Sequence, residues 1–150
     1  YNFLPTEISA AFGLVQLKKL KKFAAIRQSN FNSLYEFFSK TKFFKLPRQL
    51  PEVKTSWLAF PLTINENAPF SRLEIVKYLE MIGIQTRPIF TGNVLKQPAF
   101  SKINYKNLGK DYEIANCIME NSFLIGCNHG LTEKHIEKIK NAFTTFLSKY

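Results

Sequence analysis

Four residues suited to holding an anionic or sugar-bearing ligand lie close together in one segment: Arg87, Gly92, Asn93 and Gln97. An arginine can make a bidentate contact to a phosphate or carboxylate, and a glycine allows positive φ or a close backbone approach to a ligand. The two amides offer both donors and acceptors. A polar loop at the end of a rigid strand is a common way to build a ligand site. An ordinary turn with a surface arginine explains the same residues equally well, so spacing alone leaves both interpretations open.

The elements that must position this loop alternate along the chain. The apolar pattern predicts the order helix, strand, helix, strand, helix, strand, helix. The expected helices cover residues 7–39, 72–82, 111–120 and 133–149, and the expected strands cover 56–64, 84–90 and 122–127. This order predicts an α/β domain of the α+β type, in which a small three- to four-stranded sheet carries helices mainly on one face. Strand direction is not readable from the pattern.

Residues at the ends of these elements support the boundaries. Thr6, Ser71 and Thr132 are side chains that cap helix N-termini, and Gly83 stands where a helix-ending C′ residue is expected. Residues 41–53 are predicted to form a loop. Pro61 favours an edge position or a bulge for the first strand, because proline cannot donate a ladder hydrogen bond.

The first part of the long N-terminal helix is apolar on nearly every side, from Ile8 to Leu17. A helix that is apolar all round is normally buried all round. One small domain can bury only one face, so we expect the other face to meet another domain or subunit. The chain also opens abruptly at Tyr1, close to this apolar pattern, and we expect it to be a piece of a longer protein.

The composition fits one globular domain with a basic surface. The chain has 150 residues, 45% of them apolar, and a formal net charge of +10. Such a surface attracts nucleic acid, anionic lipid or phosphorylated small molecules. Lysines and aromatic residues interleave in residues 18–23 and 40–45, which keeps a nucleic-acid-binding module open as an alternative. The phenylalanines have core spacing, however, so a solvated helix face is the favoured interpretation, and we expect no nucleic acid as partner.

Cysteine and histidine are too sparse for a disulfide scaffold or a complete metal site. The only cysteines are Cys117 and Cys127, and the only histidines are His129 and His135. We expect reduced thiols, no bound metal and no complete set of catalytic residues. The sequence shows no signal peptide and no apolar run long enough to span a bilayer, so we expect a cytoplasmic protein without membrane contact.

Three segments together resemble one enzyme family. Residues 1–20 (YNFLPTEISAAFGLVQLKKL), 86–100 (TRPIFTGNVLKQPAF) and 115–132 (ANCIMENSFLIGCNHGLT) resemble the C-terminal domain of DegT/DnrJ/EryC/StrS sugar-nucleotide enzymes. These are fold-type I enzymes that use pyridoxal 5'-phosphate or pyridoxamine 5'-phosphate. The GN and QPA elements of the second segment are similar to the branch of nucleotide-linked 4-keto-6-deoxyhexose 3-dehydrases. The resemblance covers nearly the whole chain but only the small domain of the parent enzyme.

The resemblance implies roles for particular residues. Asn2 matches a residue that reaches the cofactor phosphate of the neighbouring subunit, which implies a homodimer with shared active sites. Arg87, Gly92, Asn93 and Gln97 match the loop expected to face a nucleotide-sugar substrate. Leu4 departs from the family, which usually has a basic residue there. The chain has no match to the four-cysteine iron–sulfur set of the best-known dehydrases.

The resemblance also implies a reaction in deoxysugar biosynthesis. In the dehydrase branch a His stands where the aminotransferases have a Lys, and the C3 hydroxyl of the sugar is lost. The alternative within the family is an aminotransferase that makes an amino sugar. Because the residue that separates these activities lies outside this chain, no catalytic residue is expected in it, and the chain alone is expected to be inactive.

Overall fold

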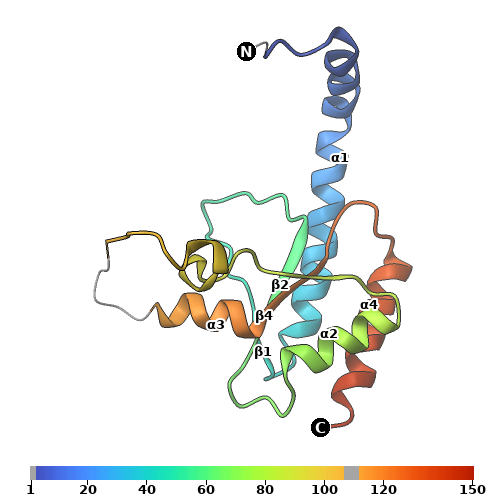
Figure 1. The fold of residues 1–150 in the computed structure, drawn as a ribbon. Coiled ribbons are helices and arrows are strands. Elements are labelled where there is room, and N and C mark those ends of the chain that lie inside the picture. The colour runs from blue at the N-terminus through green and yellow to red at the C-terminus, as the bar shows by residue number, and fades with distance from the viewer. Residues whose placement is uncertain (1–2, 107–111) are drawn as a thin grey trace.

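A four-stranded antiparallel sheet forms the centre of the molecule (Figure 1). The computed structural model describes residues 3–106 and 112–150. The strand order is β1-β2-β4-β3, and every neighbouring pair is antiparallel. The strands are β1 (Phe44–Lys45), β2 (Ala59–Ile64), β3 (Thr86–Pro88) and β4 (Ser122–Gly126). The α+β type of domain and its small sheet are therefore confirmed.

The described residues also form four α-helices and two short 3₁₀ helices. They are α1 (Glu7–Phe38), α2 (Arg72–Met81), η1 (Val94–Lys96), η2 (Pro98–Phe100), α3 (Glu113–Asn121) and α4 (Glu133–Leu147). The N-caps form as predicted at Thr6, whose hydroxyl accepts from the Ser9 N–H, and at Ser71, which makes a capping box with Glu74. Gly83 takes φ +76° directly after α2, as a C′ residue should.

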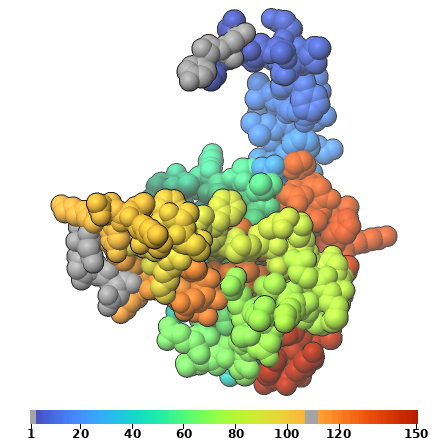
Figure 2. Space-filling view, viewed as in Figure 1, coloured from blue at the N-terminus to red at the C-terminus, as the bar shows by residue number. Residues whose placement is uncertain are grey.

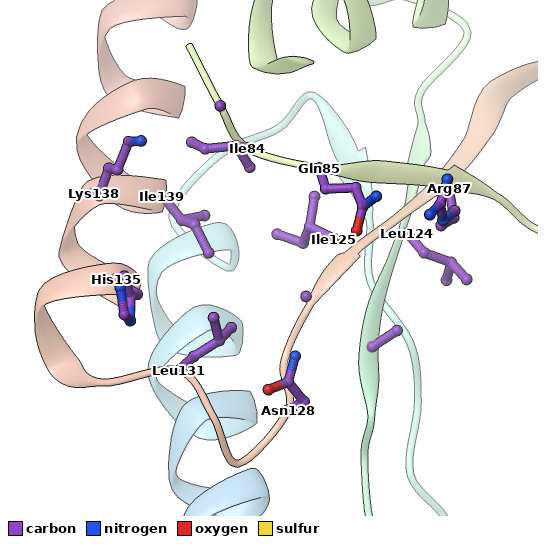
Figure 3. A pocket seen from close by; sticks show the side chains of 13 residues that line it. Ile84, Gln85, Arg87, Leu124, Ile125, Asn128, Leu131, His135, Lys138 and Ile139 are labelled. Atoms are coloured by element: carbon purple, nitrogen blue, oxygen red, sulfur yellow. The ribbon is translucent and has the colours of Figure 1, made fainter. Parts of the chain in front are cut away.

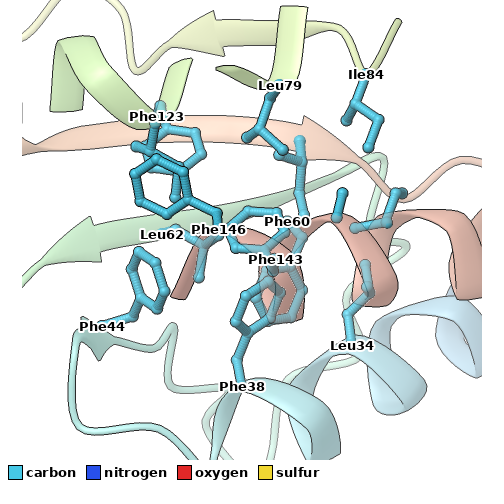
Figure 4. Packing of buried hydrophobic residues seen from close by; sticks show 14 of the residues in the cluster. Leu34, Phe38, Phe44, Phe60, Leu62, Leu79, Ile84, Phe123, Phe143 and Phe146 are labelled. Atoms are coloured by element: carbon cyan, nitrogen blue, oxygen red, sulfur yellow. The ribbon is translucent and has the colours of Figure 1, made fainter. Parts of the chain in front are cut away.

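One face of the sheet carries the core (Figure 4). Burial alternates along β2, so Phe60, Leu62 and Ile64 point to the same side. Helices α1, α2 and α4 cover that side with large apolar residues, among them Leu34, Phe38, Leu79, Phe143 and Phe146. The Phe38 ring lies 4.7 Å from the Phe143 ring and 5.5 Å from the Phe60 ring, centroid to centroid. Aromatic packing therefore joins α1, β2 and α4.

Several boundaries differ from the sequence prediction. The strand predicted over 56–64 begins only at Ala59, and the last helix, predicted over 133–149, ends at Leu147. A short strand, β1, lies inside the segment 41–53 that was predicted to be a loop, because Phe44 and Lys45 pair with Ile64 and Thr63. The strand predicted over 84–90 is only β3, since the Ile84 N–H still bonds to the Leu79 carbonyl at the end of α2. The third helix begins at Glu113. The predicted start at Asp111 lies outside the described residues.

Pro61 lies where β2 is paired on one side only. The strand lies between β1 and β4, but β1 pairs only with Thr63 and Ile64. At Pro61 the strand is therefore an edge on the β1 side within the described residues, which agrees with the expected position of a proline.

The N-terminal half of α1 projects from the body (Figures 1 and 2). Its large apolar side chains are exposed: Ile8, Phe12, Leu14, Val15, Leu17 and Leu20. The C-terminal half instead buries Phe31, Leu34 and Phe38. In the structure this first half buries none of its faces, and the expectation that it meets another domain or subunit stays a prediction. No described helix is long and apolar enough to cross a membrane.

Candidate functional site

The loop that follows β3 is folded tightly onto α3. Gly92 has φ +66°, and a Cβ added to it would lie 2.5 Å from Met119 Cβ and 2.6 Å from Met119 Cγ. Both the backbone conformation and the close contact exclude a side chain there. The glycine is thus explained by an approach of the loop to a helix of the same chain.

Asn93 anchors the same loop and is only 7% exposed. Its Oδ1 accepts a hydrogen bond from the Leu95 N–H at 3.0 Å, which caps η1. Its Nδ2 donates to Oδ1 of Asn116 in α3 at 2.8 Å. The side chain therefore holds the loop in one conformation against α3.

Gln97 and Lys96 complete the closure of the loop. Gln97 Nε2 donates to the Thr91 carbonyl at 2.9 Å, which joins the two ends of the turn. Lys96 Nζ lies 3.4 Å from Oε1 of Glu120 at the end of α3. Within the described residues, these contacts hold the loop in one conformation. The roles of Gly92, Asn93 and Gln97 in substrate binding stay predictions.

Arg87 differs from its neighbours because its side chain is exposed and forms no hydrogen bond or ion pair with the other described residues. It lies in β3 opposite Leu124 of β4, whereas the adjacent Thr86 lies opposite the core residue Ile125. Successive strand residues point to opposite faces. The guanidinium is therefore held on the sheet face away from the core and keeps its donors available.

A tether at the start of β3 fixes the position of Arg87. Oε1 of Glu80 in α2 accepts hydrogen bonds from the N–H of Thr86 at 2.5 Å and from its hydroxyl at 2.7 Å. These two bonds, the backbone one first, lower the pKa of Glu80 below its ordinary value, with a smaller contribution from the Arg87 charge. The strand is thus tied to α2 by an ionised carboxylate.

A pocket of about 340 Å³ opens beside Arg87, between β3, the end of β4 and α4 (Figure 3). Its apolar lining includes Ile84, Leu124, Ile125, Leu131 and Ile139, and its polar lining consists of Gln85, Arg87, Asn128, His135 and Lys138. In Figure 3 the two cationic side chains come from opposite walls, β3 and α4. An apolar surface with cations at its rim suits an anionic ligand that has an apolar part.

Sequence reasoning missed the wall of this pocket that α4 provides. Lys138 and His135 lie far from Arg87 in sequence, and only the folded sheet brings them near it. His135 also helps to cap the N-terminus of α4, and its position three residues after Thr132 could have indicated this capping role. Its Nδ1 accepts from the Thr132 N–H at 3.1 Å and so caps α4.

Two other predictions concern the cofactor and metal ligands. Asn2, predicted to reach the cofactor phosphate, lies outside the described residues. Cys127 is buried, and His129 and His135 have different neighbours. Within residues 3–106 and 112–150, no group of three or more His, Cys, Asp or Glu side chains is arranged to hold a metal ion.

The antiparallel sheet, the helices on one face and the long first helix define the class of protein. The model of the DegT/DnrJ/EryC1/StrS aminotransferase family matches residues 1–144, and the chain belongs to this family. The same fold occurs in an aminotransferase from Psychrobacter cryohalolentis, with a TM-score of 0.86 over 99% of this chain and 40% of that one, at 20% identity. At that identity the likeness establishes the fold alone.

Relatives that are more similar in sequence include a lipopolysaccharide biosynthesis protein and 3-dehydratases. The chain is 36% identical over 149 residues to the lipopolysaccharide biosynthesis protein RfbH of Salmonella typhimurium, covering 97% of this chain and 33% of the relative. It is 36% identical over 143 residues to the GDP-4-keto-6-deoxy-D-mannose 3-dehydratase of Yersinia pseudotuberculosis, covering 95% and 35%. The chain thus spans about a third of the length of these relatives.

A solved structure from the same branch has a closely similar fold. It is the Escherichia coli GDP-4-keto-6-deoxy-D-mannose-3-dehydratase with bound hydrated pyridoxal phosphate, and its TM-score is 0.84 at 27% identity. The likeness covers 95% of this chain and 36% of that one.

Proposed function

We propose that this chain is the single C-terminal small domain of a larger enzyme that uses pyridoxal 5'-phosphate or pyridoxamine 5'-phosphate and acts on a nucleotide-linked keto-sugar. Family membership over residues 1–144 supports this proposal, as does the share of about a third that the chain covers in each relative. The cofactor-binding large domain of such an enzyme lies outside this chain.

Within the family, we assign the parent enzyme to the 3-dehydratases of 4-keto-6-deoxyhexoses. The observation that carries this choice is the naming of the relatives that are at least 31% identical. Three of them have 3-dehydratase names, including a dTDP-4-dehydro-2,6-dideoxy-D-glucose 3-dehydratase from Saccharopolyspora spinosa. The aminotransferase structures are at most 20% identical and support the fold only. A sugar aminotransferase is the alternative.

The described residues fit a substrate-facing role better than a cofactor-holding one. Arg87 and Lys138 supply positive charge and the pocket supplies amide groups, which suit the phosphates and hydroxyls of a nucleotide-sugar. The cofactor, when bound, supplies the electron sink for loss of the C3 hydroxyl. Asn2 is the residue of this chain proposed to reach its phosphate, from the neighbouring subunit.

Arg87 is the side chain most able to bind the substrate directly. It is exposed, its strand is fixed by Glu80 and Thr86, and no carboxylate of the described residues is paired with it. A guanidinium in this state can bind a substrate phosphate bidentately. Gly92, Asn93 and Gln97 are proposed to shape the adjacent loop so that its backbone faces the same substrate.

A homodimer with shared active sites and a cytoplasmic location are part of the same proposal. The exposed apolar half of α1 supports a partner surface, because isolated domains rarely leave so many large apolar side chains in water. Nucleic-acid binding has less support. Phe44 is buried, Phe43 is half-buried against the core, and the Phe23 ring is stacked on His129, so these rings are not available for stacking on bases.

The test uses the parent protein with pyridoxamine phosphate and a nucleotide-linked 4-keto-6-deoxyhexose. Mass spectrometry of the sugar product should show loss of the C3 hydroxyl oxygen without incorporation of an amino group. A product that gains an amino group with glutamate as donor would replace the dehydratase by the aminotransferase. This chain by itself should show neither reaction, and turnover by it would contradict its assignment as a single small domain.

A further inference from the structure

His129, in the loop after β4, lies against α1. Its ring is stacked on Phe23, with the centroids 3.9 Å apart and an angle of 20° between the two planes. Its Nδ1 lies 3.2 Å from Nε of Arg27 and 3.1 Å from Nη2 of the same side chain. Both His129 and Arg27 are half-buried. The contact therefore joins two segments that are 102 residues apart in the sequence.

The chemistry of Arg27 decides which form of the imidazole this contact requires. A guanidinium has N–H donors and no acceptor. Nδ1 of His129 must therefore accept from Arg27 with its lone pair, and the ring proton lies on Nε2. A proton on Nδ1 would remove that lone pair and would place an imidazolium directly against a guanidinium. The contact therefore exists only in the neutral form of His129.

The surroundings of this contact contain one positive charge and otherwise neutral groups. From the segment before β2, the Ser56 hydroxyl accepts from Nη1 of Arg27 at 3.3 Å, and the uncharged thiol of Cys127 donates to the Arg27 carbonyl. His135 of α4 is bonded instead at the N-terminus of its own helix. In the described part of the chain, neither Arg27 nor His129 forms an ion pair with a carboxylate. A second cation at His129 would therefore be repelled without compensation.

Asn30 attaches the same loop to α1 by hydrogen bonds that do not titrate. Its Nδ2 donates to the carbonyls of Asn128 at 2.9 Å and of Leu131 at 3.3 Å. Within the loop, the Gly130 N–H donates to Oδ1 of Asn128 at 2.8 Å, and the Leu131 N–H donates to the Asn128 carbonyl at 3.2 Å. These bonds keep the loop closed around the histidine, and the two amide protons show whether it is closed.

We propose that the contact between Arg27 and His129 is a proton-sensitive latch, in which protonation of the histidine releases the loop after β4 from α1. The closed loop requires the neutral ring and the open loop does not, so the open state binds more protons. The closed state is therefore stable at and above neutral pH, and it loses stability as pH falls through the range in which histidine ordinarily titrates. The proposal concerns the fold of this chain and does not depend on the proposed function.

The decisive experiment adds His129→Asn to a chain that already carries His135→Gln, which replaces the other histidine. Asparagine keeps an acceptor close to the position of Nδ1 but does not titrate, and glutamine is an ordinary capping-box residue. Hydrogen–deuterium exchange of the Gly130 and Leu131 amides, divided by the intrinsic rate at each pH, measures opening of the loop.

Between about pH 7.5 and pH 5, protection of these amides should fall about tenfold in the chain that retains His129, because an imidazole in the open loop titrates near pH 6.5. With His129→Asn, protection should change by less than about twofold over the same interval, because no proton is then linked to opening. An equal loss of protection with and without His129→Asn would overturn the proposal.

Nuclear magnetic resonance of the ring nitrogens tests the proposal in the unsubstituted chain, so it does not require the variants to fold. At neutral pH, His129 should be the Nε2–H tautomer. On acidification, its protonation and the shifts of the Gly130 and Leu131 amides should share one midpoint. A proton on Nδ1 of His129 at neutral pH, or amide shifts that follow His135 instead, would overturn the proposal. So would a His129 ring that stays neutral down to about pH 5, below the ordinary range of histidine.

Discussion

Arg87 and Asn93 lie in the same segment but have opposite surroundings. Asn93 is buried and makes two side-chain hydrogen bonds, whereas Arg87 is exposed and unpaired within the described residues. At the scale of single residues, the segment therefore contains one side chain that is free to bind and others that maintain the loop. This distinction can be tested, because binding and stability respond to different substitutions.

Arg87→Met should impair binding without affecting folding. In the parent enzyme, loss of a charge-assisted contact to the substrate should raise KM by roughly 10- to 100-fold. The free energy of unfolding should change by less than about 0.5 kcal/mol, because the side chain is exposed. Steady-state kinetics and urea unfolding measure the two effects. Lys134→Met removes an exposed charge from α4 outside the pocket and serves as the control. An unchanged KM for Arg87→Met would remove Arg87 from the site.

Gly92→Ala, in contrast, should lower the stability of the fold. The added methyl group would overlap Met119, and φ of +66° is unfavourable for alanine, so the loop must shift from α3. We expect a loss of about 1–3 kcal/mol in the free energy of unfolding, measured by urea denaturation of the chain. Thr91→Ala, one residue earlier and exposed, should be close to neutral. A neutral Gly92→Ala would mean that the loop does not pack on α3 as described.

At the scale of elements, α2 and β3 are joined by a carboxylate whose ionisation matters. The hydrogen bonds from Thr86 hold the pKa of Glu80 below the ordinary value of 4.5. Because the folded pKa is the lower one, this stabilisation is fully present above pH 4.5 and is lost as pH falls through the lowered pKa. Glu80→Gln should therefore be less stable than the wild type near neutral pH and lose less stability in acid.

Urea unfolding midpoints of the wild type and of Glu80→Gln, measured between neutral pH and about pH 3, test this prediction. That interval covers the pH range in which carboxylates ordinarily titrate. Glu52→Gln is the matched control, since Glu52 is exposed and has no partner among the described residues. Parallel acid profiles for the wild type and Glu80→Gln would show that the bonds from Thr86 do not stabilise the fold through the charge.

The helices were predictable from sequence because their signals are local. Thr6, Ser71 and Gly83 mark helix ends by contacts within a turn, and the structure uses all three as expected. Strand β1 was missed because two residues carry no periodicity, and its only reason to be a strand is its pairing with Thr63 and Ile64. Its existence depends on a neighbour that is distant in sequence.

The candidate site shows the same limit. Arg87 and its loop could be found from residue types in one segment, whereas Lys138 and His135 join them only through the fold. The reason for Gly92 was also not readable, because its close contact is with Met119 of α3. Sequence reasoning can find the residues that bear chemistry, but tertiary contacts decide which of them remain exposed.

At the scale of the whole molecule, α1 belongs to two environments. Its C-terminal half is part of the aromatic core, and its N-terminal half projects from the body (Figure 2). The large apolar side chains of the projecting half are exposed. Between these halves, Arg27 and Asn30 fasten the helix to the loop after β4. The core of this chain therefore sets the direction in which the projecting half points, and that half carries the surface proposed for a partner subunit.

The reactivity of Cys127 measures whether α1 stays packed against the residues that follow β4. The thiol is fully buried and its Sγ donates to the Arg27 carbonyl at 3.7 Å, which couples the residue directly after β4 to α1. Burial raises the pKa of the thiol to about 12, so it remains protonated and unreactive at neutral pH. Alkylation of Cys127 by iodoacetamide should therefore occur only when the whole core opens, at a rate that follows global unfolding. The less buried Cys117 should react first.

Peptide mass mapping after timed alkylation separates the two cysteines. In denaturant both should react at similar rates, which provides the reference. Phe143→Leu leaves an incompletely filled space beside Phe38 and should accelerate Cys127 labelling by about the factor by which it raises the unfolding equilibrium constant, since both depend on the same opening. Rapid labelling of Cys127 in the folded wild type would instead mean that α1 separates from β4 locally, without unfolding of the core.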